Sequence, residues 1–213
     1  MFKNRIHRSV PALAAAAALV ALLAAPAAQA ATPRPQNLTR LISDSQAIVQ
    51  GVVRSVTDGI DQNGLPYTEV TIHVRASAKG SIADDSDYTF RQFGLTKPMT
   101  MANGHRLVAV SPDGFPKWHE GESVVAFLHQ PASRTGLQTT AGLAQGKLNF
   151  VNDHLFNEFN NSGLFDGVRI SDGLLTPEEQ NMLTTPRAVD AGTFMNLVHR
   201  AVSEQWIENG EMR

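Results

Sequence analysis

The sequence predicts a mainly β protein: a small, antiparallel, partly open barrel of the oligonucleotide/oligosaccharide-binding (OB) kind, followed by a C-terminal amphipathic helix. Two observations predict it. Short segments rich in β-branched residues recur at intervals of roughly 10 to 15 residues and are separated by turn residues. A longer helical pattern occurs only near the C-terminus. A β-sandwich is the second choice. Because strands do not alternate with helices in the pattern, a parallel α/β fold is disfavoured.

The first two predicted strands are the best defined. Residues 38–45 favour a short helix ahead of a strand over residues 47–57, in which Gly51 indicates a bulge or bend. Residues 58–64 (DGIDQNG) are predicted to form a hairpin turn, because their Asp and Asn residues do not keep the register of a calcium-binding loop. Residues 67–78 then alternate apolar and polar side chains, so one face of this strand is expected in the core.

The remaining strands are shorter. The pattern predicts strands at residues 88–93, 106–110 and 122–129. It also predicts a final hairpin, in which residues 138–143 pair with residues 147–151 across a turn at 144–146.

The C-terminal part of the chain differs in kind. Residues 153–173 have the composition of a loop, and Thr176-Pro177-Glu178-Glu179 is a helix start with a capping box. Residues 190–206 predict a longer helix. Its apolar stripe is expected to pack on the core and consists of Phe194, Leu197, Val198, Ala201 and Val202.

These segments give four parts. Residues 1–30 read as a cleavable signal peptide: Lys3, Arg5 and Arg8 precede an apolar run, which ends in Ala28-Gln29-Ala30. Residues 31–37 are a loose leader, residues 38–152 the barrel core, and residues 153–213 a loop with C-terminal helices that pack on the barrel. A secreted protein, periplasmic or extracellular, is therefore expected.

The charge of the mature chain argues against some partners. Removal of the three basic residues of the signal peptide leaves 15 Lys and Arg against 20 Asp and Glu, a formal charge of −5. We therefore expect no nucleic-acid partner. The apolar stretches after the signal peptide are also too short for stable membrane insertion.

The residue types exclude several chemistries. The chain has no Cys, so it has no disulfide framework, thiol nucleophile or Cys-based zinc site. It has no G-x-S-x-G nucleophile motif, and residues 142–147 do not end as a phosphate-binding loop does. The sequence therefore predicts no cofactor and identifies no catalytic residue, and a non-enzyme is the preferred interpretation.

Two groups of residues are candidate sites. His105, His119, Glu120 and His129 could converge as metal ligands if the strands bring them together, although separate solvated histidines are the simpler interpretation. Aromatic residues in irregular segments could form a platform for a ligand on a face made by residues 112–121 and 153–166. The candidates are Phe115, Trp118, Phe156 and Phe159. In the simpler interpretation, these loops fold back and bury their aromatics against the barrel.

The order of landmarks resembles that of a group of secreted bacterial modules with no known activity. The resemblance spans roughly residues 38–205 and consists mainly of turn glycines and strand cores. It is carried by Leu41, Ser43, Asp44, residues 48–53, Tyr67-Thr68, Lys79-Gly80, residues 114–116, Gly121-Glu122, residues 124–128, residues 142–147 and a helix at residues 194–198. Such modules are β-barrel domains, and some occur in chains with metalloprotease-like regions. The resemblance implies a fold and a location but no reaction.

Three functional hypotheses remain. The preferred one is a secreted, non-catalytic module that binds an extracellular protein, peptide or glycan. The second is a metal-binding protein or metal-dependent hydrolase that uses the His/Glu residues. The third is a secreted protease inhibitor that presents a loop to an active site.

Overall fold

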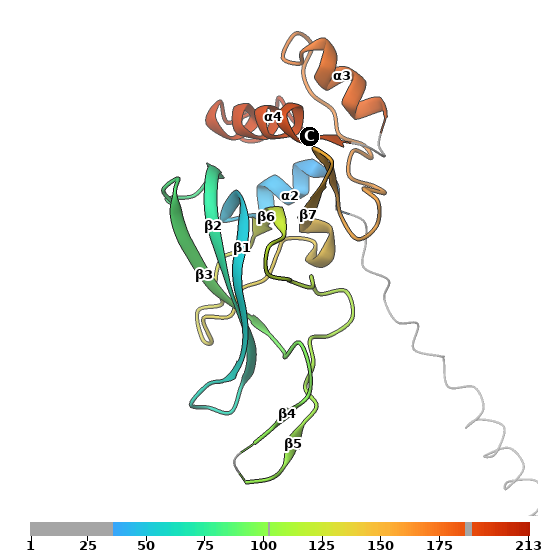
Figure 1. The fold of residues 1–213 in the computed structure, drawn as a ribbon. Helices are drawn as coiled ribbons and strands as arrows, with labels where there is room; N and C mark the ends of the chain where they lie inside the picture. Colours follow the sequence, from blue (N-terminus) through green and yellow to red (C-terminus); the bar gives the residue numbers. More distant parts are fainter. Residues whose placement is uncertain (1–35, 102, 186–188) are drawn as a thin grey trace, which may run out of the picture. The chain divides into compact units, whose positions relative to one another are not determined.

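The chain builds one antiparallel seven-stranded sheet in the order β3-β2-β1-β6-β7-β8-β9 and a separate hairpin, β4-β5 (Figure 1). The computed structural model describes residues 36–101, 103–185 and 189–213; the expected signal peptide and most of the leader lie outside these residues. The strands are β1 (Ala47–Ile60), β2 (Pro66–Lys79), β3 (Ser86–Phe93), β4 (Met99–Thr100), β5 (Arg106–Leu107), β6 (Ser123–Leu128), β7 (Lys147–Val151), β8 (His154–Phe156) and β9 (Val189–Asp190).

The predicted fold class is confirmed. The protein is mainly β, its sheet is antiparallel and not closed, and a helix follows at the C-terminal end, as in a small, partly open barrel. The register of β1 against β2 shifts between Gln50 and Gly51, where the sequence predicted a bulge. A Cβ on Gly51 would lie 2.2 Å from the carbonyl oxygen of His73, so only glycine fits this close approach.

The sheet separates two apolar clusters. Successive residues of β1 alternate between them. Ile48 belongs to the cluster that contains the helix residues, and Val49 belongs to the cluster on the opposite face of the sheet. Every residue of β6 from Val124 to Leu128 is buried, because both faces of this central strand are covered. The cluster on the helix side also contains the predicted stripe residues Phe194, Leu197, Val198 and Ala201.

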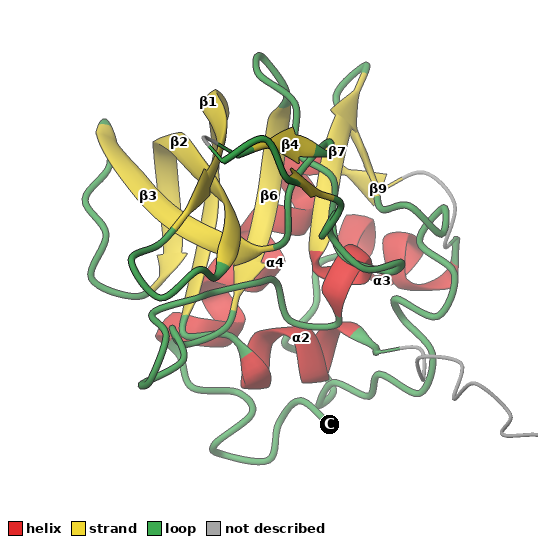
Figure 2. Ribbon diagram, turned by 90° about the horizontal axis from the view of Figure 1, so that it is seen from below, coloured by secondary structure: helices red, strands yellow, loops and turns green. Residues whose placement is uncertain are grey.

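Three α-helices are described: α2 (Leu38–Asp44), α3 (Pro177–Thr184) and α4 (Ala191–Ser203). Figure 2 shows α2 and α4 on the same side of the strands. The predicted capping box of α3 is present: Thr176 accepts a hydrogen bond from Glu179 N, and the Glu179 carboxylate accepts one from Thr176 N. Helix α4 ends earlier than predicted, at Ser203, and Asp190 is its N-cap rather than its first helical residue.

The predicted hairpin between residues 138–143 and 147–151 is wrong. Residues Leu143–Gly146 form a 3-10 helix, η1, and β7 pairs with β6 and β8 instead. Residues 138–141 instead bond to other parts of the chain: Gln138 N donates to Arg91 O, His129 N donates to Thr139 O, and Ala141 N donates to Phe127 O. Strands β8 and β9 extend the sheet beyond residue 152, the predicted end of the barrel core.

Candidate functional site

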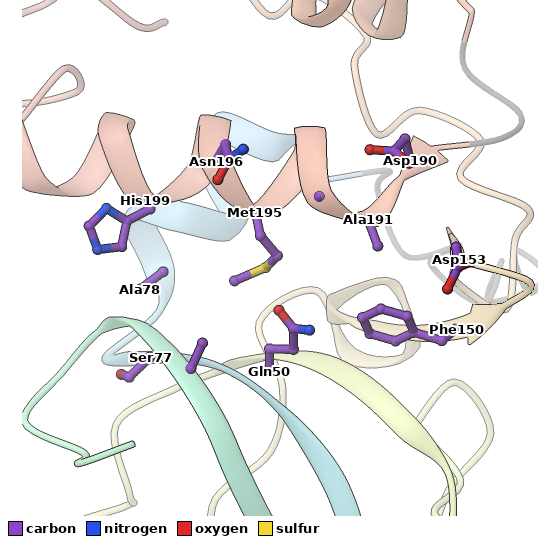
Figure 3. Close-up of a pocket in the computed structure, with 12 residues that line it drawn as sticks. Gln50, Ser77, Ala78, Phe150, Asp153, Asp190, Ala191, Met195, Asn196 and His199 are labelled. Carbon is purple, nitrogen blue, oxygen red and sulfur yellow. The ribbon is translucent and has the colours of Figure 1, made fainter. Parts of the chain in front are cut away.

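A groove of about 550 Å³ lies between helix α4 and the strands beneath it (Figure 3). Gln50 on β1 points toward α4, and Met195 on α4 points toward the sheet. The end of β2 contributes only small side chains, which leave the space under the helix open. The groove is lined by Gln50, Ala76, Ser77, Ala78, Phe150, Asp153, Asp190, Ala191, Gly192, Met195, Asn196 and His199.

The walls of the groove are fixed by the fold. Strand β9 pairs with β8 directly before α4, with His154 opposite Asp190, so the start of the helix is bound to the sheet. Ala191 N donates a hydrogen bond of 3.0 Å to the carbonyl oxygen of Asp153. Because Phe194 and Leu197 on the other face of α4 are fully buried, the helix cannot move down to close the groove.

The polar groups of the groove are distributed unevenly. Asp153 and Asp190 lie at one end, and His199 lies at the other (Figure 3). Asp153 is in the left-handed backbone region, with φ of 63°, a conformation that Asp tolerates better than most residues. Between the two ends, Met195 from α4 and Phe150 from β7 present apolar surface from opposite sides of the groove, and both are only partly buried. The groove is therefore acidic at one end and apolar at its centre.

The carboxylate of Asp190 is held in place by hydrogen bonds. Asp190 Oδ1 accepts hydrogen bonds of 2.8 Å from both the backbone N and the Oγ1 of Thr193. The backbone hydrogen bond from Thr193, its side-chain hydrogen bond and the charge of His154 hold the pKa of Asp190 below its ordinary value, against the small opposing effect of burial. Asp190 is thus a charged helix cap, and both Asp190 and Asp153 are exposed to solvent.

Trp118, a predicted ligand-binding residue, is buried, with 4% of its surface exposed. Its indole N–H donates to Gln92 Oε1 at 3.1 Å, and its ring packs edge-on against Phe90 at 5.4 Å between centroids. For Trp118, the alternative interpretation of a loop folded back onto the barrel describes the structure. Trp118 and His119 also line a hollow of about 370 Å³, together with Gln92, Leu95 and Val110 among others.

The other predicted aromatics lie elsewhere. Phe156 and Phe159 line a separate hollow of about 640 Å³ with residues 160–163 and Asp166, and Phe159 is 45% exposed. Phe115 is half-buried, and its backbone N donates to Pro112 O in a turn. Trp118 thus lines one hollow, Phe156 and Phe159 line another, and Phe115 is among the lining residues of neither.

The predicted metal ligands have separate partners. His119 Nδ1 lies 2.8 Å from Glu122 Oε1, and Glu120 Oε1 accepts a hydrogen bond from Val56 N. His129 Nδ1 lies 2.9 Å from the carbonyl oxygen of Asp44, and His105 is exposed in the loop between β4 and β5. Within residues 36–101, 103–185 and 189–213, no three His, Asp or Glu side chains are grouped as a metal site needs. The convergence that the metal hypothesis required does not occur.

Sequence reasoning missed the groove under α4. The available signal was the run Ala76-Ser77-Ala78, where a strand that faces a helix normally carries larger side chains. That signal has meaning only when the position of α4 is known.

Searches of protein-family models, of curated proteins and of solved structures give no match to this chain.

Proposed function

We propose that this protein is a secreted, non-catalytic binding module that takes a short extended peptide in the groove under α4. The observation that carries the proposal is the groove itself: a preformed space of about 550 Å³ with an apolar centre and polar ends. This volume is within the roughly 300–1,000 Å³ typical of ligand sites.

Two features of the sequence support secretion. The basic, apolar and Ala-x-Ala order of residues 1–30 is that of a cleavable signal peptide. The resemblance to secreted bacterial modules over residues 38–205 points to the same compartment. In the described part of the chain, no helix is both long and apolar enough to cross a bilayer.

The chemistry of the groove favours a peptide over a glycan. Met195 and Phe150 offer an apolar surface for one side chain, and Met adapts to side chains of different shape. The amides of Gln50 and Asn196 each carry a donor and an acceptor, as the main chain of an extended peptide requires. Asp153 and Asp190 favour a basic side chain or an amine at their end of the groove.

A binding role also fits the state of the carboxylates. A general base needs a pKa near the working pH, but the pKa of Asp190 is lowered and its Oδ1 is committed to Thr193. The charge of Asp190 is therefore suited to attracting a cation.

The proposal is tested by placing a large side chain at the rim of the groove so that it obstructs the peptide. Asn196 and Ser203 are both exposed on α4, but only Asn196 lines the groove, so Asn196→Trp and Ser203→Trp form a matched pair. The protein is purified from its own host, and ligands that remain bound are detected by native mass spectrometry. A parallel titration uses a fluorescent peptide in which one Lys is followed by Leu and Val.

The wild type and Ser203→Trp should carry bound mass or bind the peptide, and Asn196→Trp should lose either signal at unchanged melting temperature. Equal binding by both variants would place the ligand outside the groove. Failure of the wild type in both assays would refute the proposal.

A further inference from the structure

We propose that Asn160 is a site of N-linked glycosylation, at which the side-chain amide carries an oligosaccharide in the secreted protein. Asn160-Asn161-Ser162 is an N-x-S motif, the acceptor sequence for this modification in secreted chains. The inference rests on the proposed secretion, because the sugar is added on the far side of the membrane that the chain crosses. It concerns a surface other than the groove under α4, since none of residues 157–166 lines that groove.

The motif lies in a tight turn. Asn160 and Asn161 have φ values of 51° and 61°, and Ser162 N donates a hydrogen bond of 3.0 Å to Phe159 O. Positive φ at both central residues is characteristic of a type I′ turn, and Asn adopts this conformation more readily than most residues that have a Cβ. The chain therefore reverses direction within the motif.

The two adjacent asparagines have opposite environments. Asn161 is fully buried: its Oδ1 accepts a hydrogen bond from Asn157 N at 2.9 Å, and its Nδ2 donates to Leu155 O at 2.7 Å. Asn160 is exposed, and its amide is in none of the side-chain hydrogen bonds that hold this loop in the described part of the chain. Asn161 thus anchors the turn, and the acceptor nitrogen of Asn160 faces solvent.

The surroundings of the amide have room for a sugar. Phe159, Asn160 and Ser162 all line the hollow of about 640 Å³ described above. Phe159 is 45% exposed, so its ring is available to the apolar C–H face of the first sugar. Glu158, which is also exposed, lies two residues before Asn160, and the bacterial form of the acceptor motif has an acidic residue at this position.

A second N-x-S/T motif, Asn37-Leu38-Thr39, has a different structure. Asn37 is the N-cap of α2: its Oδ1 accepts a hydrogen bond from Arg40 N at 3.1 Å, and its Nδ2 donates to Asp166 O at 2.9 Å. The Thr39 hydroxyl, which completes the motif, is buried. Both recognition groups of this motif are therefore inaccessible in the folded chain, although its sequence is as complete as that of the first motif.

The reaction joins a sugar to the amide nitrogen. The donor is an oligosaccharide linked through pyrophosphate to a lipid, and the enzyme is a membrane-bound oligosaccharyltransferase. The Nδ2 of Asn160 forms a bond to C1 of the first sugar, the bond between C1 and the pyrophosphate oxygen breaks, and the lipid pyrophosphate leaves. The amide releases one proton, and nothing is oxidised or reduced. The hydroxyl of Ser162 is part of the recognised sequence and does not react.

The test is mass spectrometry, under denaturing conditions, of the protein from the secreted fraction of its own host, as the intact chain and as peptides. Denaturation removes ligands that are bound without a covalent bond. The variants are Asn160→Asp, which removes the amide but tolerates the left-handed backbone, and Ser162→Ala, which keeps Asn160 but breaks the motif. Ser162→Thr is the matched control, because it preserves the motif. Circular dichroism verifies that each variant is folded.

We expect the wild type and Ser162→Thr to carry the mass of an oligosaccharide on the peptide that contains Asn160. Asn160→Asp and Ser162→Ala should lose this mass completely and keep the circular dichroism spectrum of the wild type. A wild type with the mass of the bare polypeptide, added mass that remains in Asn160→Asp, or sugar on Asn37 would overturn the proposal.

The same spectra separate this proposal from the proposed secretion, because they also identify the N-terminus. A chain that begins at Ala31 and carries no sugar would refute the glycosylation of Asn160 and leave the secretion standing. A chain that keeps residues 1–30 and carries no sugar would refute both.

Discussion

Replacement of Lys147 by Met tests the buried ion pair that joins β7 to the turn before β6. Only 5% of the Lys147 side chain is exposed. Its ammonium donates to Lys117 O at 2.6 Å and to Glu122 Oε2 at 2.5 Å, and it lies 5.0 Å from the centre of the Trp118 ring. Two of the three donors of the ammonium are therefore hydrogen-bonded, and its charge also lies over the face of an aromatic ring.

The two partners respond differently to burial. Burial lowers the pKa of Lys147, even though Glu122 acts to raise it. For Glu122, burial raises the pKa, but hydrogen bonds and charge from Lys147, with hydrogen bonds from His119, bring it below its ordinary value. Burial thus opposes the charged form of both partners, and the pair contributes little net stability. Its removal as a pair should cost far less than the loss of one partner.

The expected magnitude follows from this difference. Removal of one partner of a buried pair costs about 3–5 kcal/mol. Glu122 is 27% exposed and keeps His119 as a partner, so we expect about 2–3 kcal/mol for Lys147→Met. For a chain of this size, that corresponds to a fall in melting temperature of roughly 4–12 °C. The double substitution Lys147→Met with Glu122→Gln should recover at least about 1 kcal/mol relative to the sum of the single effects.

The assay is urea denaturation at neutral pH of the wild type, both single variants and the double variant, followed by tryptophan fluorescence and by circular dichroism. Agreement between the two probes establishes two-state unfolding. Strictly additive free energies, or a Lys147→Met variant as stable as the wild type, would show that the ion pair is not energetically coupled and that the desolvation argument is wrong.

Three further substitutions test local features. Partial burial raises the pKa of Asp58, but hydrogen bonds from Thr96, Thr68 and Lys97 N bring it below the ordinary value of 3.8. These hydrogen bonds therefore stabilise the folded protein above this value, and their contribution is lost as the pH falls through the folded-state pKa. Asp58→Asn should therefore lower the melting temperature at pH 7 and flatten its dependence on pH below about 4. Gly94→Ala should cost at least about 2 kcal/mol in urea denaturation, because φ is 91° and Ser111 blocks the Cβ. Thr176→Ala should cost about 1 kcal/mol by loss of the cap, and Thr176→Ser should restore it.

The strands and helices with strong local patterns could be predicted from the sequence. The alternation of Val70, Ile72 and Val74 identified β2 and its buried face, and the capping box at Thr176 identified the start of α3. These features depend on neighbours within a few residues, so the sequence pattern contains the information. The shortness of β5, two residues against five predicted, reflects a turn from Val110 N to Val108 O that no local pattern signals.

The site residues were harder to predict because their settings come from distant parts of the chain. Trp118 is buried by Phe90 and Gln92, which are more than 25 residues away in sequence, and nothing in its own loop indicates this. Likewise, the groove depends on α4 crossing β1 and β2. Gln50 and Met195 face each other across it but lie at opposite ends of the described chain.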